Sequence, residues 1–378
     1  MAYGALLNSS VAMRYFAFLA PTLNFQPGDI SRVPIAHGLE NLEFQTARAV
    51  EIARELWDAN ELSWDFARSP LVLPSDGVSI SDCLDMAAGQ DRAQRAELSM
   101  IERRHDVLLA PLYGIPNDEL EIVSDESASD VTDVGEVVGR LVSYAVGCMF
   151  GRYSLDEPGL ILANQGDTLR HYITKVPNSK FTPDEDNVIP IVDGDWFEDD
   201  IVARFRQFLR VAFGDEYFEE NLRFVTESLG VKDIRDYFVK SFYKDHVQRY
   251  KKRPIYWLFS SPKGSFTALI YMHRYTPSTV STVLNEYLRE FRAKLSSSLQ
   301  QQEGLAAGSG TPRQQAAALK EADRLRKVLL ELEEYEHDVL YPLASRQLAI
   351  DLDDGVKANY PKFGAALKKI AGLEASDE

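Results

Sequence analysis

One segment of the sequence gathers the residue types that bind phosphate groups. Between Lys240 and Tyr275 there are eight basic residues and a single acid, Asp245, so the segment carries a formal charge of +7. The whole chain carries −17, which leaves −24 on the rest of it. Phosphate binding needs basic surface, and the distribution of charge matters more than its sum. The segment therefore predicts a nucleic-acid-binding face on an otherwise acidic chain.

Two interpretations of this segment compete. In the structural one, its aromatic and aliphatic side chains form the core of a two-stranded unit, and its lysines are only solvated. That apolar set is Tyr256, Trp257, Phe259, Phe266, Ile270 and Tyr271. In the functional one, the cations line one edge and bind DNA phosphates, and an arginine also reaches a guanine edge. The predicted DNA contacts are Lys244, Arg249, Lys251, Lys252, Arg253, Lys263 and Arg274.

A second candidate is the run from Gly147 to Tyr153. Its two glycines flank a predicted helix end, so one interpretation is a tightly packed helix C-cap. The other is that Arg152 and Tyr153 project toward DNA and add to the basic face. Cys148 is expected to be a small buried hydrophobic side chain.

The sequence has none of the familiar catalytic motifs. An amino-methyltransferase holds the flipped base with an Asn/Asp–Pro–Pro–Tyr/Phe tetrapeptide, which is absent, as is a glycine-rich turn for the methyl donor. There is no Walker A sequence and no GxSxG elbow. The acidic run at 351–354 has no closing glutamate of an EF-hand, so we interpret it as a helix N-cap and turn. We predict no catalytic, cofactor-binding or metal-binding residue in this chain.

Composition narrows the class of protein. An apolar share of 45% is that of an ordinary globular chain. Cys83 and Cys148 are the only cysteines, which excludes a disulfide framework and suits a reducing cytoplasm. No run of eighteen apolar residues and no secretory signal pattern is present, so we expect a cytoplasmic protein without a membrane partner.

Hydrophobic periodicity places these motifs on elements. Helices are expected over residues 5–20, 39–61, 90–112 and 135–150, and another after Asp200, with an acidic segment at 117–136 that forms a solvated loop or a strand edge. Strands at 255–260 and 266–272, joined by Ser261–Pro262–Lys263–Gly264, predict a hairpin. Helices at 279–301 and 313–340, joined by a Gly/Ala/Ser connector at 304–312, predict an antiparallel helical hairpin.

Several long strings resemble the C-terminal region of PglX, the adenine-specific DNA methyltransferase of BREX phage-defence systems. They are VGCMFGRYSLDEPGLILANQGD (146–167), VIPIVDGDWFEDDIVARF (188–205), FYKDHVQRYKKRPIYWLFSSPKGSFTALIYMHRY (242–275) and LAIDLDDGVKANYPKFG (348–364). ELWDANELSWDF (55–66) and LAPTLNFQPGDISRVPIA (19–36) also match, in the same order. The resemblance covers nearly the whole chain.

The resemblance implies a protein like the single-chain Type IIG restriction–modification enzymes. In that family an N-terminal domain methylates adenine at N6 with S-adenosylmethionine, and a target-recognition region follows. The string LNFQPGDISRVPI resembles the end of a target-recognition domain that passes into a spacer helix. We therefore expect an α+β fold in three parts: 1–70 (recognition-domain end and spacer helix), 71–277 (mixed central domain with the basic hairpin) and 278–378 (helical hairpin and tail).

These expectations lead to one functional hypothesis and one alternative. The hypothesis is the DNA-recognition and assembly half of a phage-defence adenine-N6 methyltransferase, without methyl-transfer activity of its own. Its expected partners are double-stranded DNA, a catalytic half on another polypeptide that binds S-adenosylmethionine, and other BREX proteins. The alternative is a protein-interaction module that docks defence subunits or phage proteins without contacting DNA.

Overall fold

The computed structural model describes residues 2–19, 26–73, 77–116, 133–308 and 310–374. The chain divides into two compact units. Unit 1 consists of Met1–Phe66 and Ser81–Asp133, and unit 2 consists of Ala67–Ile80 and Val134–Glu378. The boundaries expected near residues 70 and 277 do not coincide with the limits of these units, because the helices after Ser81 pack with the N-terminal ones.

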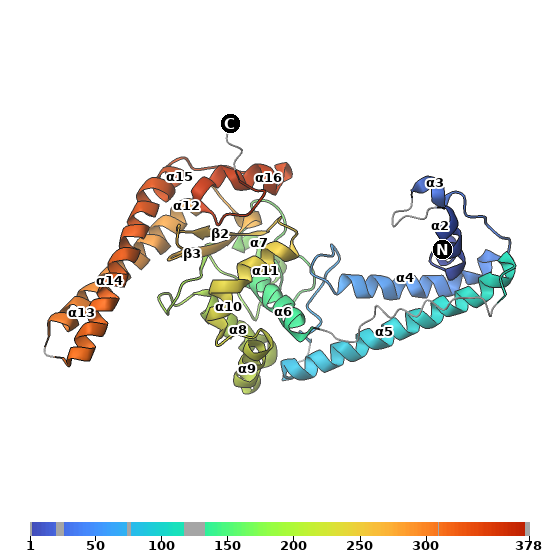
Figure 1. Cartoon of the computed structure of the whole chain (residues 1–378), viewed down its shortest axis with the longest axis horizontal. Coiled ribbons are helices and arrows are strands. Elements are labelled where there is room, and N and C mark those ends of the chain that lie inside the picture. Colours follow the sequence, from blue (N-terminus) through green and yellow to red (C-terminus); the bar gives the residue numbers. More distant parts are fainter. Residues whose placement is uncertain (1, 20–25, 74–76, 117–132, 309, 375–378) are drawn as a thin grey trace. The chain divides into compact units, whose positions relative to one another are not determined.

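Unit 1 is built from helices alone among its described residues. Two long helices, α4 (Glu43–Asp58) and α5 (Ile80–Leu109), lie side by side (Figure 1). Arg48 joins them with a two-pronged ion pair, Nε to Oε1 of Glu97 at 2.9 Å and Nη2 to Oε2 at 3.0 Å. The shorter elements are α1 (Ala2–Leu7), α2 (Ser10–Leu19), α3 (Pro27–Ile30) and the 3-10 turns Leu39–Leu42 and Ala110–Tyr113.

The core of unit 1 lies where the short N-terminal helices meet the end of α5. Apolar side chains at helical spacing on α1 and α2 are buried there, because one face of each helix must leave water. The buried set is Ala2, Ala5, Leu6, Val11, Ala12, Phe16, Val33, Leu39, Leu42 and Leu109. The expected helix over residues 5–20 is therefore two helices, and the expected helix from residue 90 begins ten residues earlier.

Unit 2 is organised around a small antiparallel sheet. Its strands are β1 (Ile189–Pro190), β2 (Tyr256–Ser260) and β3 (Thr267–Tyr271), in the order β1-β3-β2. Tyr256 faces Tyr271 at the open end of the β2–β3 hairpin, and Ser260 faces Thr267 next to the turn. This register confirms the hairpin expected from the sequence, and the α+β class is confirmed with it.

Both faces of this sheet are covered. The central helix α6 (Val134–Met149) ends against one face, where the ring of Phe150 stacks on Tyr256 with centroids 5.3 Å apart. On the other face, Trp257 packs edge-on against Tyr360 and Phe363. The aromatic residues of the basic segment are therefore core, as the structural interpretation holds: Tyr256, Trp257, Phe259, Phe266, Ile270 and Tyr271 are all buried.

Short helices surround the sheet and α6. They are α7 (Leu169–Lys175), α8 (Ile201–Phe213), α9 (Phe218–Ser228), α10 (Ile234–Tyr237), α11 (Tyr243–Arg249), α12 (Thr279–Thr282), α15 (Tyr341–Ser345) and α16 (Val356–Asn359). Several of them are continued by π or 3-10 turns, notably 238–242 before α11 and 360–366 after α16. The acidic run at 351–354 is a short turn in which the Asp351 carboxylate accepts the amide of Asp353 at 3.0 Å.

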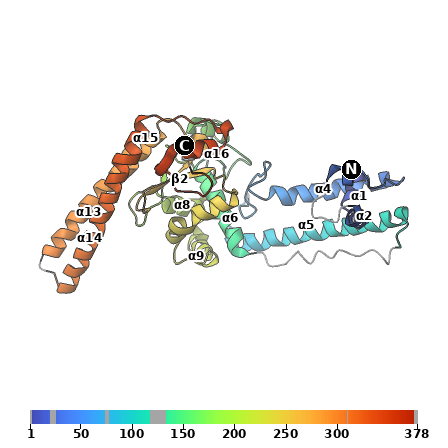
Figure 2. The ribbon, with the colours of Figure 1, turned by 45° about the horizontal axis from the view of Figure 1, so that its top comes forward.

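The expected helical hairpin is present. Helices α13 (Arg289–Ala307) and α14 (Pro312–Tyr335) pack along each other, as Figures 1 and 2 show. A π turn over Val283–Leu288 leads into α13, and a second over Glu336–Leu340 follows α14. The predicted connector is shorter than expected because α13 continues through Gly304. Most of the acidic segment predicted at 117–136 lies outside the described residues.

No helix in the described part of the chain has both the length and the apolar character needed to cross a bilayer.

Candidate nucleic-acid interface

The loop after α11 presents three cations in a row. The helix ends in a Schellman motif, in which the amide of Lys252 donates to Val247 O at 2.8 Å and that of Lys251 to Gln248 O at 2.9 Å. Lys251 and Lys252 both adopt left-handed backbone, with φ of 49° and 61°. Such backbone costs an L-residue with a Cβ roughly 1–2 kcal/mol. The strained turn leaves Lys251, Lys252 and Arg253 exposed.

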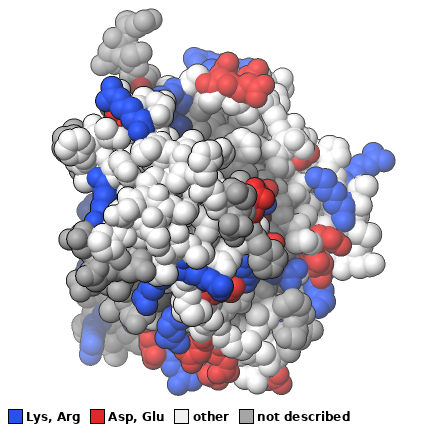
Figure 3. All heavy atoms as spheres, turned by 90° about the vertical axis from the view of Figure 1, so that its right-hand side faces the viewer, with Lys and Arg blue, Asp and Glu red and all other residues white. Residues whose placement is uncertain are grey.

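These three cations have no acidic neighbour in the described part of the structure. Some other surface cations do: Lys240 pairs with Asp236 at 2.6 Å, and Arg210 pairs with Asp215 at 2.6 Å. No described carboxylate lies within ion-pair distance of Lys251, Lys252 or Arg253. On the face drawn in Figure 3, Lys and Arg side chains lie among Asp and Glu side chains. The loop is a local positive surface on an acidic chain.

Arg152 and Arg249 converge beside the same histidine. His246 lies one turn before Arg249 on α11, and its imidazole is buried. Burial lowers the pKa of His246 well below its usual value, and the positive charges of Arg249 and Arg152 lower it further. Arg152 Nη1 donates to the Tyr271 hydroxyl, and His246 Nε2 accepts the amide of Tyr256, the strand partner of Tyr271. Two predicted segments that lie about 100 positions apart in the sequence therefore meet at the open end of the hairpin.

Tyr153 does not project toward solvent, contrary to the functional interpretation. It is buried and stacks on Tyr144 with centroids 5.3 Å apart. Gly147 makes room for it, because a Cβ at that position would lie 2.4 Å from the Tyr153 ring. Arg152 is half-buried, and its Nε donates to the Tyr153 hydroxyl at 3.0 Å. Cys148 is buried and free, as expected.

Arg274 is also placed away from solvent. Its guanidinium donates to three backbone carbonyls, those of Phe150 (3.3 Å), Asp184 (2.8 Å) and Glu185 (2.9 Å). Burial lowers the pKa of Arg274. The side chain joins the end of α6 to the 184–185 segment, so the guanine contact predicted for it does not fit this geometry.

Lys263 and Lys244 are exposed but do not join the loop cations. Lys263 sits in the hairpin turn, at the far end of β2 from Arg253. Five strand residues at about 3.3 Å each place the turn roughly 15 Å from the open end. Lys244 lies on the exposed side of α11, two turns before Lys251. The single strip expected from the sequence is therefore one compact group, Arg152, Arg249, Lys251, Lys252 and Arg253, with Lys263 apart from it.

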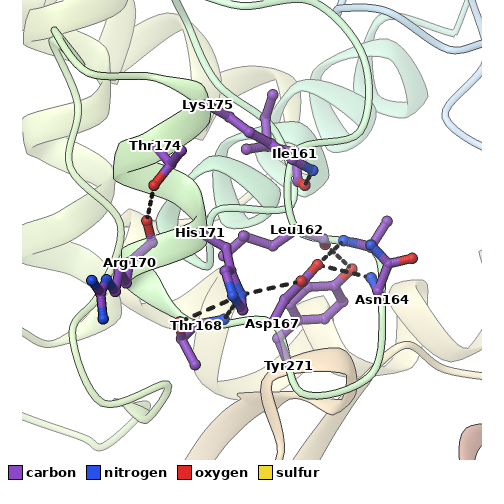
Figure 4. Close-up of polar contacts among 11 residues, drawn as sticks. Ile161, Leu162, Asn164, Asp167, Thr168, Arg170, His171, Thr174, Lys175 and Tyr271 are labelled. Carbon is purple, nitrogen blue, oxygen red and sulfur yellow. Dashed lines mark hydrogen bonds and ion pairs between the residues drawn. The ribbon is translucent and has the colours of Figure 1, made fainter.

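A second loop packs against the open end of the hairpin. The Tyr271 hydroxyl donates to Leu162 O at 2.7 Å and accepts from Arg152 Nη1 at 3.2 Å. Asp167 holds this loop together, since its Oδ2 accepts the amides of Ala163 and Asn164, both at 2.9 Å (Figure 4). Its Oδ1 lies 3.4 Å from His171 Nδ1.

Sequence reasoning missed His246 and His273 as members of this group. Burial lowers the pKa of His273 to about 4, and the nearby Arg152 contributes to the shift. The spacing of His246 and Arg249, three residues apart on one helix, was the available signal. Nothing in the sequence pattern connects His273 to Arg152, because that contact depends on the sheet register. In the described residues, no three His, Cys, Asp or Glu side chains gather as a metal site.

Comparison with known proteins gives two relatives. No protein-family model matches the sequence. The chain is 33% identical to the "Adenine-specific methyltransferase BrxX" of Escherichia coli O9:H4 (strain HS), over 98% of this chain and 33% of the relative. It is 32% identical to the "Adenine-specific methyltransferase PglX" of Lacticaseibacillus casei (strain Zhang), over 98% of this chain and 32% of that protein. The chain spans about a third of the length of these curated relatives, and over that third it is similar in sequence to adenine-specific methyltransferases of the PglX and BrxX kind.

Proposed function

We propose that this chain is the DNA-recognition and assembly part of a phage-defence (BREX) site-specific adenine-N6 DNA methyltransferase. Its two relatives carry the name of that activity. Its own sequence holds neither the tetrapeptide that grips a flipped adenine nor a glycine-rich turn for the methyl donor. In this proposal, S-adenosylmethionine binds to a catalytic domain outside these residues. The complex works in the cytoplasm with other BREX proteins.

The cluster at the open end of the β2–β3 hairpin carries the proposal. Lys251, Lys252 and Arg253 are exposed with no described acid within ion-pair distance, and the charges of Arg249 and Arg152 act on the nearby His246. Exposed cations displace condensed counterions from DNA, and the entropy of that release drives binding. Held in this way, the duplex stays in register while its target adenine turns out of the helix.

Salt-dependent binding to duplex DNA tests this role. Charge reversal at Lys251, Lys252 and Arg253 should weaken binding well over tenfold, and the slope of log K against log salt should fall by about 0.9 for each lost contact. A control that reverses Lys357, Lys368 and Lys369 has the same net charge and alters exposed side chains elsewhere in unit 2. Equal loss in both triple variants would mean that only net charge matters, and unchanged binding in the first would refute the placement of the face.

One observation favours a second candidate, a protein-interaction module. The α13–α14 hairpin exposes Leu305, Leu319 and Leu330 in its described part. Exposed leucines on a helical hairpin suit docking to another protein. If the parent chain shows no salt-dependent DNA binding but retains capture of purified BREX subunits, this second role replaces the first.

A further inference from the structure

Arg152 is a half-buried cation without an acidic partner in the described structure. Its Nε donates to the Tyr153 hydroxyl at 3.0 Å, and its Nη1 donates to the Tyr271 hydroxyl at 3.2 Å. The two rings flank the guanidinium, with their centroids 5.2 Å and 6.0 Å from Cζ. Burial raises the pKa of Tyr271, so its hydroxyl is uncharged at neutral pH. No described carboxylate lies within ion-pair distance of Arg152.

This arrangement leaves donors unused. A guanidinium has five N–H groups in a planar fork, and the two hydroxyls take one from Nε and one from Nη1. Withdrawing such a cation from water is unfavourable unless an anion accompanies it. Asp167, the acid whose charge acts on His273 and Tyr271, already accepts two amides of its own loop. The fork therefore has capacity for an oxyanion from outside.

Two uncharged histidines lie beside the fork. Nε2 of His246 accepts the amide of Tyr256 at 3.2 Å, which places the proton on Nδ1, and that atom is buried without a hydrogen-bond partner. Nδ1 of His273 is also buried and without a described partner. Burial, with Arg152 nearby, lowers the pKa of both imidazoles. Both imidazoles are neutral at pH 7, so the positive charge beside them that an anion would meet is that of Arg152.

We propose that Arg152 is the seat of one phosphodiester group of bound DNA, held by its guanidinium fork at the open end of the β2–β3 hairpin. This inference rests on the proposed DNA-recognition function and deepens it. The ring of Tyr250 lies 4.7 Å from that of His246, and Lys251 follows Tyr250 directly, so the seat adjoins the exposed cations. Arginine matches phosphate because two N–H groups bond two oxygens at once. The exposed loop attracts the backbone, and Arg152 fixes one phosphate in register.

A methylphosphonate scan tests the seat. Each phosphodiester of a binding duplex is replaced in turn by an uncharged methylphosphonate, and affinity is measured for the parent and for Arg152→Gln. At the seated phosphate, the replacement should lower the DNA affinity of the parent about tenfold, as expected for loss of a charge-assisted hydrogen bond. It should lower the affinity of Arg152→Gln less than twofold. Arg206→Gln, an exposed arginine on α8, should behave as the parent. If no position couples to Arg152, the seat is refuted.

A measurement on the unaltered protein covers the case in which Arg152→Gln does not fold. NMR titration of the His273 imidazole should show its pKa rise from about 4 toward its usual value when duplex DNA binds, because the phosphate offsets the Arg152 charge. Inorganic phosphate alone should produce the same shift in direction at millimolar concentration. DNA binding that leaves the pKa of His273 unchanged refutes the seat but not the DNA-recognition role. If the protein does not bind duplex DNA, the DNA-recognition role is refuted. If inorganic phosphate then also leaves the pKa of His273 unchanged, the seat is refuted as well.

Discussion

The carboxylate of Glu331 on α14 accepts a hydrogen bond from the Ser261 hydroxyl at 2.6 Å, in the turn of the β2–β3 hairpin. The same Oε1 accepts the amide of Lys263 at 2.7 Å, and Oε2 accepts the Ser265 hydroxyl at 2.5 Å. Glu331 is buried, so it satisfies three donors of a turn that would otherwise lack partners. One acid thus fastens the sheet to the helical hairpin.

Replacing Glu331 should destabilise unit 2. In Glu331→Gln the side chain keeps one acceptor oxygen, and its new NH2 group faces the serine hydroxyls and the amide that Glu331 accepts. We therefore expect a loss of about 1–3 kcal/mol in the free energy of unfolding. Denaturant unfolding followed by tryptophan fluorescence measures it, since Trp257 lies in the adjoining strand. Glu334→Gln, an exposed position on the same helix, is the control and should change little. A loss equal to that of the control would show that the turn is held by other contacts.

The contribution of Glu331 should also depend on pH. Burial by itself raises the pKa of Glu331, but the hydrogen bonds from Ser261, Ser265 and Lys263 outweigh it and the net pKa is lowered. A lowered pKa in the folded state stabilises the fold above the unfolded value of about 4.3, and that stability is lost as pH falls through the folded value. The difference in unfolding free energy between parent and Glu331→Gln should therefore shrink below about pH 4.3. A difference that grew on acidification would contradict this assignment.

Glycine at position 251 or 252 should raise stability while it weakens DNA binding. Glycine adopts left-handed backbone without penalty, so Lys251→Gly and Lys252→Gly should each raise the unfolding free energy by about 1 kcal/mol. Each should also remove one phosphate contact and lower the salt slope by about 0.9. Lys252→Ala is the matched control, because it loses the charge and keeps the strain. Thermal unfolding and DNA titration in the same buffer give both values, and destabilisation by glycine would contradict the strained geometry.

Arg274 and Arg253 should show opposite behaviour. Removing the Arg274 guanidinium in Arg274→Ala leaves three buried carbonyls without donors, which should cost about 3 kcal/mol or more of stability. Under conditions where this variant is folded, its DNA affinity should match that of the parent. Arg253→Ala alters an exposed side chain, so its stability should stay within about 0.5 kcal/mol while its DNA affinity falls. Lost affinity in folded Arg274→Ala would restore it as a DNA contact.

Strong local patterns were sufficient to predict part of this fold. The helix expected at 135–150 is α6, because its apolar residues repeat with helical period and most residues from Val138 onward are buried. The hairpin was equally clear, since branched and aromatic runs flank a turn sequence. The start of α5 at Ile80 was missed because the first turns of this helix carry Asp82, Asp85 and other polar residues without a clear apolar stripe.

The candidate site was predicted only as a segment. Charge clustering identified the loop at 251–253 because a run of cations in an acidic chain is visible in the sequence. It could not distinguish Arg253, which is exposed, from Arg274, which is buried. Arg253 comes just before one aromatic strand and Arg274 just after another, so their sequence surroundings are alike. That difference arises from the carbonyls of Phe150 and Asp184, which are distant in the sequence and close only in the folded chain.

The Glu331 anchor has a consequence for how unit 2 responds to load. The turn that it binds and the cationic loop lie at opposite ends of the same two paired strands. The β2–β3 hairpin therefore connects α14 to the loop that begins at Lys251. We expect that a partner which tilts the helical hairpin also displaces the loop at 251–253, because paired strands connect the two.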